Sequence, residues 1–350
     1  MKSSDTTQNS PGNSKENVQT RSQDNPLGYE KESKLLVGFA IPCIISMLVT
    51  ALYNIVDQIF IGQGVGYLGN AATNVAFPLT TICLAITLLI SIGSASRFSL
   101  SLGEGDADRA AQAVGNALAM MVLFGILYTL CIEIFLVPLL NAFGATQDVL
   151  PYAIEYTRIT AVGMPLLIIT NGMSNLARAD GSPNYSMMCM LIGAIINTIL
   201  DPLFIFKFHM GVRGAAFATV IGQFFSFLMA LYYVKKFTHI RLKKQHFILK
   251  PQVCLNIASL GMSNCLNQVA ITFVQIVMNN SMTYYGAKTI YGSEIPLAAS
   301  GIVMKTNGIL LSVIIGLSQG SQPIIGFNYG AKKYDRVRGT YRLAISCNLV

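Results

Sequence analysis

The sequence predicts an all-α polytopic membrane protein, and three observations lead to that fold class. Charged residues make up only 11 % of the 350 residues, whereas soluble domains carry about 25 %. Hydrophobic residues make up 53 %, and they occur in runs of roughly 20 residues or more, the length that crosses a bilayer core. Short basic loops separate these runs, as is typical of multi-pass membrane proteins.

Hydrophobic periodicity predicts eight complete spans and the beginning of a ninth. The eight spans cover residues 35–61, 67–99, 113–138, 153–178, 185–207, 214–236, 253–284 and 295–325. The ninth begins near residue 338 and is still open at Val350. We therefore expect a fragment of a longer chain, truncated within its ninth helix.

The distribution of polar residues divides the chain into four parts. Residues 1–30 are rich in Ser, Asn, Gln and Thr and lack the apolar segment of a signal peptide, so we expect a disordered cytoplasmic tail. Residues 31–236 form an N-lobe of six helices, residues 237–252 a basic cytoplasmic linker, and residues 253–350 a partial C-lobe.

Loop charge predicts that the N-terminus lies in the cytoplasm. Every even-numbered loop is basic, most of all Lys235–Lys250, whereas the loop Gly62–Asn70 carries no charge. Lys207 and Arg213, around the loop after the fifth span, depart from this pattern. The basic residues behind the net charge of +8 concentrate in these loops, so the excess does not indicate a nucleic-acid partner.

An internal repeat at one constant offset relates the region of the second span to the region of the eighth. The matched pairs are Gly93/Gly320, Ser94/Ser321, Gly103/Gly330, Asp108/Asp335 and Arg109/Arg336. An even number of spans separates the copies, so both have the same orientation. This is a parallel repeat about an axis along the membrane normal, as in transporters with two rocking halves.

Two aspartates inside predicted spans are the main functional candidates. Asp57 in the first span ends a polar stripe at helical spacing, and Asp201 in the fifth span follows Asn197 by four residues. The other stripe residues are Ser46, Thr50, Tyr53 and Asn54. A carboxylate facing lipid costs several kcal/mol, so each Asp is expected to face protein or a wet cavity. The alternative is a solvated Asp near a helix end.

Polar residues in three other spans are weaker candidates. In the fourth span, Tyr156 and Asn175 either join the two acids or serve helix packing. In the seventh and eighth spans, four residues could line a cavity in the second half, with helix packing and snorkelling as the alternatives. These four residues are Gln268, Gln275, Asn279 and Lys305.

The proline and cysteine residues indicate no catalytic or metal-binding site. Pro42 removes one backbone hydrogen bond and can bend the first helix. The seven Cys include no CxxC pair, and most lie inside apolar spans, where they act as small hydrophobic residues. We expect no cofactor, and no metal beyond a possible Na⁺ at Asp57 and Asp201.

Five segments resemble the MATE (multidrug and toxic compound extrusion) family, nearest to its DinF/MepA-like branch. SMLVTALYNIVDQIFIG resembles the family's first helix with its acid, and GAIINTILDPLFIF with GVRGAAFATVIG resembles its fifth and sixth helices. NLARADGSPNYS resembles the loop between helices 4 and 5, and GFNYGAKKYDR the loop between helices 8 and 9. The resemblance covers about residues 30–350.

The resemblance implies two six-helix lobes around a central cavity. It implies a monomeric plasma-membrane antiporter, not an enzyme, that uses H⁺ or Na⁺ to export lipophilic, often cationic, drugs. The implied cation-coupling residues are Asp57, Tyr156, Asn175, Asn197, Asp201 and Thr219. Pro42 matches a proline proposed to bend the first helix on protonation. The seventh helix has no acid here, so a sodium site of the kind that some relatives carry there is not expected.

Three alternatives remain open at the level of sequence. A lipid-linked oligosaccharide flippase shares the architecture but needs a more cationic cavity, for which Lys305 is the obvious candidate. An intramembrane aspartyl protease would use Asp57 and Asp201, but Val56 and Leu200 precede them in place of the Tyr and Gly typical of such enzymes. A receptor or scaffold without transport does not explain the repeat and the paired acids.

Overall fold

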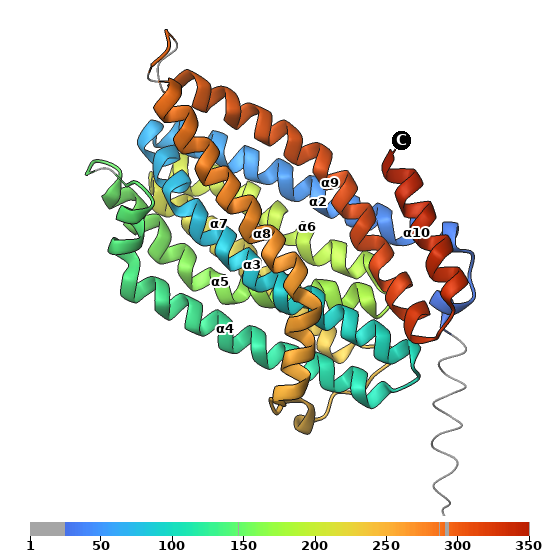
Figure 1. Ribbon diagram of the computed structural model, residues 1–350. Coiled ribbons are helices and arrows are strands. Elements are labelled where there is room, and N and C mark those ends of the chain that lie inside the picture. Colours follow the sequence, from blue (N-terminus) through green and yellow to red (C-terminus); the bar gives the residue numbers. More distant parts are fainter. Residues whose placement is uncertain (1–24, 146, 287, 291–293, 350) are drawn as a thin grey trace, which may run out of the picture.

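A computed structural model describes residues 25–145, 147–286, 288–290 and 294–349. Over these residues the regular structure is entirely helical, and eight helices are long and apolar enough to cross a membrane. The fold class predicted from the sequence is therefore confirmed. Figure 1 shows the long helices running side by side as one bundle.

The long helices follow one another in chain order with short connections. They are α2 (Glu32–Gly64), α3 (Tyr67–Gly103), α4 (Ala107–Ala142), α5 (Leu150–Ala179), α6 (Pro183–Pro202), α7 (Val212–Tyr232), α8 (Pro251–Gly286), α9 (Glu294–Gly330) and α10 (Tyr334–Leu349). Short helical turns are η1 (Pro26–Gly28), η2 (Leu203–Lys207), η3 (Tyr233–Lys235) and η4 (Lys244–Phe247). Each predicted span overlaps one of these helices, and most helices extend a few residues past its ends.

The helix bounds follow the internal repeat found in the sequence. Helices α3 and α9 both contain 37 residues and end on the matched glycines Gly103 and Gly330. Helix α2 packs along α9, and α3 packs along α8. The repeat pairs α2 with α8 and α3 with α9. A rotation about an axis along the membrane normal that exchanges the two halves therefore converts one of these contacts into the other.

The repeat-related glycines allow the halves to approach closely. A Cβ atom on Gly103 would run into the backbone of Phe327, and a Cβ atom on Gly330 would run into the backbone of Leu100. Small residues at such crossings let helix backbones touch in membranes, where the hydrophobic effect between helices is weak. This crossing therefore depends on both glycines.

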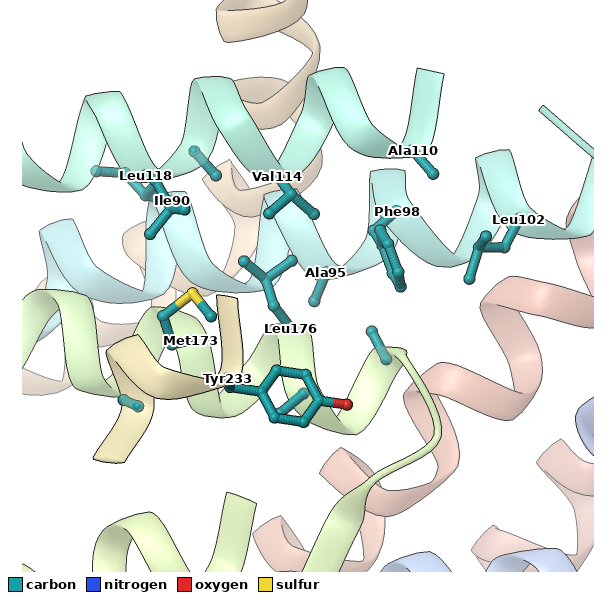
Figure 2. Packing of buried hydrophobic residues seen from close by; sticks show 14 of the residues in the cluster. Ile90, Ala95, Phe98, Leu102, Ala110, Val114, Leu118, Met173, Leu176 and Tyr233 are labelled. Carbon is teal, nitrogen blue, oxygen red and sulfur yellow. The ribbon is translucent and has the colours of Figure 1, made fainter. Parts of the chain in front are cut away.

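Helix α5 lies at the centre of the first six spans. It packs against α3, α4, α6 and α7, and its most apolar stretch is 61 % buried, compared with 11 % for α8. Figure 2 shows the core between these helices, where Phe98 and Ala95 of α3 approach Val114 of α4 and Leu176 of α5. Large apolar side chains such as Ile134 stay exposed, as a lipid-facing surface requires.

Proline affects two helices differently. In α4, Phe135 has non-helical dihedral angles (φ −106°, ψ 19°), three residues before Pro138. Since Pro138 has no N–H, the turn before it lacks one helical hydrogen bond. Helix α2 stays helical from Glu32 to Gly64 with Pro42 inside it. Bending at Pro42 stays a prediction.

Candidate functional site

Two acidic side chains meet where α2 packs against α6. The carboxyl groups of Asp57 on α2 and Asp201 on α6 lie close enough to interact directly with each other. Asp201 is fully buried, with 0 % of its surface exposed. It stands one residue before Pro202, after which the chain continues as the π-helical segment η2. Such segments occur frequently at functional sites, because they re-aim side chains out of helical register.

Polar side chains from two further helices complete this group. The Nδ2 atom of Asn197 donates to Oδ1 of Asp201 at 3.2 Å and to Oγ1 of Thr219 on α7 at 3.4 Å. Tyr53 on α2 and Tyr156 on α5 lie close enough to both carboxyls to interact electrostatically with them. Four helices therefore contribute to one polar site, which we call the acid pair site (Tyr53, Asp57, Tyr156, Asn197, Asp201 and Thr219).

The acid pair site has more acceptors than donors. Oδ1 of Asp57, Oδ2 of Asp201 and Oδ1 of Asn197 are buried without a hydrogen-bond partner among the described residues. The ion pairs of the described residues include neither acid. Most buried polar atoms have a partner, and each exception requires an explanation. A proton shared between the carboxyls, or a cation bound by their oxygens, would satisfy these atoms.

The oxygen atoms of the acid pair site are better ligands for an alkali cation than for a transition metal. Carboxylate, amide and hydroxyl oxygens converge here, and hard cations prefer oxygen ligands. No group of three or more His, Cys, Asp or Glu side chains gathers among the residues described.

Asn175 was predicted to join the acids, but the structure places it elsewhere. It lies about five helical turns from Tyr156 along α5. There its Oδ1 accepts a hydrogen bond from Arg178, whose guanidinium also lies 3.7 Å from Sγ of Cys43. Pro42 is buried beside Cys43 at the same end of the bundle. The axial rise of an α-helix already argued against grouping Tyr156 with Asn175.

Of the four candidates in the second half, the structure describes the side chain of Gln268 and not those of the other three. The side chain of Gln268 on α8 is half-buried, and the backbone carbonyl of Gln268 accepts a hydrogen bond from the Thr272 hydroxyl at 2.9 Å. The side chains of Gln275, Asn279 and Lys305 lie outside the residues whose side chains the structure describes. A cavity lined by these residues stays a prediction.

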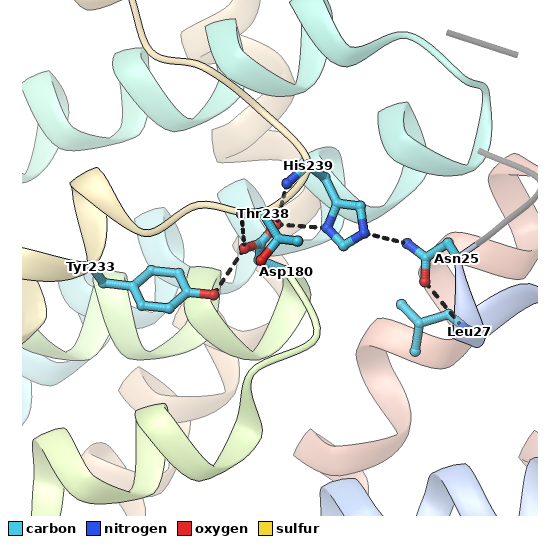
Figure 3. Close-up of polar contacts among 6 residues, drawn as sticks. All are labelled: Asn25, Leu27, Asp180, Tyr233, Thr238 and His239. Atoms are coloured by element: carbon cyan, nitrogen blue, oxygen red, sulfur yellow. Dashed lines mark hydrogen bonds and ion pairs between the residues drawn. The ribbon is translucent and has the colours of Figure 1, made fainter. Parts of the chain in front are cut away.

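A second buried aspartate, which the sequence did not single out, organises the opposite end of the bundle. Asp180 follows α5 and accepts hydrogen bonds from the Tyr233 hydroxyl at 2.8 Å and the Thr238 amide at 2.9 Å. It also contacts the amide of His239 at 3.4 Å and its Nδ1 at 2.9 Å. Nε2 of His239 lies 3.3 Å from the amide of Asn25. Figure 3 shows this group, which we call the Asp180 cluster.

The Asp180 cluster joins segments that are far apart in the sequence. Asp180 and Asn25 are both buried, and the residues between Tyr233 and His239 connect the sixth span to the seventh. No motif spacing relates these positions, since Asn25 and His239 are 214 residues apart. The weak signal was Asp180 itself, an acid directly after a spanning helix.

Comparison with known proteins identifies the family. The sequence profile of the MatE family matches residues 42–203 and 263–350, which is more than half of the chain. This chain is a MATE family transporter. Membership of a transporter family makes it a multi-pass membrane transporter and not an enzyme, which excludes the protease alternative.

Curated relatives of this MATE transporter have names that describe drug resistance. The chain is 23 % identical over 338 residues to the probable multidrug resistance protein YoeA of Bacillus subtilis (strain 168), covering 93 % of this chain and 72 % of the relative. It is 26 % identical over 331 residues to the multidrug export protein MepA of Staphylococcus haemolyticus, covering 92 % and 71 %.

Solved structures share the fold of this MATE transporter. A crystal structure of MATE in complex with MaD3S matches with a TM-score of 0.84 at 25 % identity, covering 92 % of this chain and 71 % of that one. An outward-facing multidrug resistance MATE family transporter of the MOP superfamily matches with a TM-score of 0.84 at 24 % identity, covering 90 % and 69 %. The second likeness concerns the fold alone.

Proposed function

We propose that this MATE transporter is a cation-coupled antiporter that exports lipophilic, often cationic, drugs across the plasma membrane. The observation that carries the proposal is the acid pair site, where two carboxyls meet with buried oxygens left unpartnered. The names of the curated relatives support drugs as the exported class. Membership of the MATE family supports transport itself.

The acid pair site suits coupling because its net charge differs between the cation-free and the cation-bound state. Without a cation, two carboxylates share a buried site and repel each other, and a proton or Na⁺ between them removes the repulsion. Asn197 and Thr219 offer further oxygens to Na⁺ or hydrogen bonds to the acids. The site therefore binds either H⁺ or Na⁺ as the coupling ion, without a further cofactor.

Helix α2 is the element that links this site to the second half. It carries Asp57, packs against α6 and runs along α9. A ligand shifts a conformational equilibrium only by its difference in affinity for the two states. Cation binding at Asp57 then favours one packing of α2 against α9, and drug binding favours the other, which gives antiport.

The remaining features of the proposal follow the expectations from sequence. The N-terminus lies in the cytoplasm because the basic loops share its side. The transporter acts as a monomer, and residues of the second half such as Gln268 and Lys305 line its drug cavity. These features complete the antiporter proposal.

The test measures ethidium transport by the purified protein reconstituted in liposomes. An imposed proton or sodium gradient should drive ethidium against its own gradient, and Asp57→Asn or Asp201→Asn should abolish that coupled movement. The matched control is Asp148→Asn, because Asp148 is an exposed acid outside the long helices. Normal coupled transport by Asp57→Asn would overturn the proposal. Absence of ethidium transport in the folded wild type would favour the flippase alternative.

A further inference from the structure

The outer surface of α6 and α7 carries an apolar groove with a volume of about 560 Å³. Its floor and walls include Met188 and Ile192 of α6 and Phe225 and Leu228 of α7. Met188 is 52 % exposed and Leu228 is 44 % exposed. Because both helices are membrane spans, this groove faces the acyl chains of the bilayer.

One end of the groove is polar and cationic. Nζ of Lys236 lies 5.4 Å from the ring centre of Tyr185 and 5.6 Å from that of Tyr232. The hydroxyl of Tyr185 donates to the carbonyl of Met229 at 2.7 Å, which holds its ring as a fixed wall. The groove thus runs from apolar side chains to two tyrosines and an ammonium group.

Among the described residues, no carboxylate forms an ion pair with the ammonium group of Lys236. The ion pairs formed by the described residues do not include Lys236 or its neighbour Lys235, and both side chains are exposed. Lys236 stands one residue beyond the end of its span, at the depth where lipid headgroups lie. Its charge is therefore available to an anion at the membrane surface.

We propose that this groove binds an anionic phospholipid, with an acyl chain along α6 and α7 and the phosphate on Lys236. A cation beside aromatic rings at the end of an apolar groove matches the headgroup and chain of such a lipid in charge and in polarity. A lysine that only snorkels to the interface needs no groove beneath it. The proposal is independent of the coupling ion and of the exported drug.

The site is connected to the segment between the sixth and seventh spans. The ring of Tyr185 lies 4.8 Å from that of Tyr233, and the Tyr233 hydroxyl donates to Asp180. Asp180 in turn holds Thr238 and His239. A lipid against Tyr185 therefore supports the Asp180 cluster from its membrane side and raises the melting temperature.

The test titrates the purified protein with phosphatidylglycerol or phosphatidylcholine of identical acyl chains and counts bound lipids by native mass spectrometry. Wild type should prefer phosphatidylglycerol, and Lys236→Gln should bind it about fivefold more weakly, because one basic residue near an anionic surface contributes about 1 kcal/mol. The matched control is Lys235→Gln, since Lys235 is exposed next to Lys236 but does not line the groove.

A second variant tests the groove itself. Met188→Trp fills the apolar part and keeps the charge, so it should weaken the binding of both lipids. Soluble glycerol phosphate should not compete with phosphatidylglycerol, because it has no chain for the groove. Equal losses in Lys235→Gln and Lys236→Gln would overturn the proposal, because general surface charge would then explain the preference. Wild type without a preference, or with competition by glycerol phosphate, would also overturn it.

Discussion

The acid pair site and the Asp180 cluster contain similar residue types, but they differ in whether the carboxylate oxygens have hydrogen-bond partners. Asp180 and Asp201 are both buried. Asp180 contacts Tyr233 and His239, and Asp201 lies near Tyr156 and Asn197. Both oxygens of Asp180 accept hydrogen bonds from fixed donors. In contrast, Asp57 and Asp201 face each other and leave an oxygen on each side chain without a partner.

Under the proposed function, hydrogen-bond saturation of the carboxylate oxygens, and not burial, separates a structural acid from a cation-binding acid. A satisfied buried polar network rigidifies the structure around it, whereas an unsatisfied one is costly unless a ligand completes it. The Asp180 cluster should therefore respond to mutation through stability. The acid pair site should respond through transport. Four mutations test this contrast.

The largest expected effect is the loss of stability in Asp180→Ala. The substitution leaves the Tyr233 hydroxyl, the Thr238 amide and Nδ1 of His239 without their acceptor. Leaving a buried donor without an acceptor costs about 1–3 kcal/mol for each group. Thermal unfolding in detergent should shift strongly downward relative to wild type. An unchanged melting curve would remove the structural role assigned to Asp180.

Asp57→Asn should abolish coupled export and leave the fold intact. The neutral amide cannot take the coupling proton, and it removes the repulsion between two close carboxyls. Coupled ethidium transport should fall by about 100-fold or more, a loss of about 2.7 kcal/mol. The melting temperature should stay at or above that of wild type. A large drop in melting temperature with transport retained would reverse the contrast between the two sites.

Asn197→Ala should reduce coupling without abolishing it. Its amide bridges Asp201 and Thr219, and losing hydrogen bonds to a charged group costs about 1.5–3 kcal/mol. Coupled transport should therefore fall by about tenfold or more, with both acids still able to bind the cation. Thr219→Val provides the comparison, since it removes one hydroxyl and keeps the shape. Equal, complete inactivation by both variants would mean that they damage the fold.

Asn25→Ala should have the smallest effect and should act locally. It removes the contact with His239 at 3.3 Å and the acceptor for the Leu27 amide at 3.1 Å. A typical net hydrogen bond contributes about 1 kcal/mol. The segment before α2 should then be cleaved faster by added protease, while coupled transport persists. Cleavage at the wild-type rate would show that Asn25 does not anchor this segment.

Local rules predicted much of this molecule from sequence. The spans followed from apolar runs, and the match between α3 and α9 was already visible in paired residues such as Gly103 and Gly330. Asn197 and Asp201 are four residues apart, so one helical turn brings them together. Sequence also identified Asp57 as an acid that must face protein or water. Apart from the repeat, these features depend on neighbours within one helix.

Other features depended on contacts between helices, which no spacing in the chain specifies. The packing of α2 against α6 brings Asp57 to Asp201. The Asp180 cluster joins Asn25, Tyr233 and His239 across distant segments. The sequence by itself determined which helices form and which faces are polar, because helical hydrogen bonds and lipid burial are local. Only the tertiary structure decided which polar groups meet, because that depends on how the helices pack.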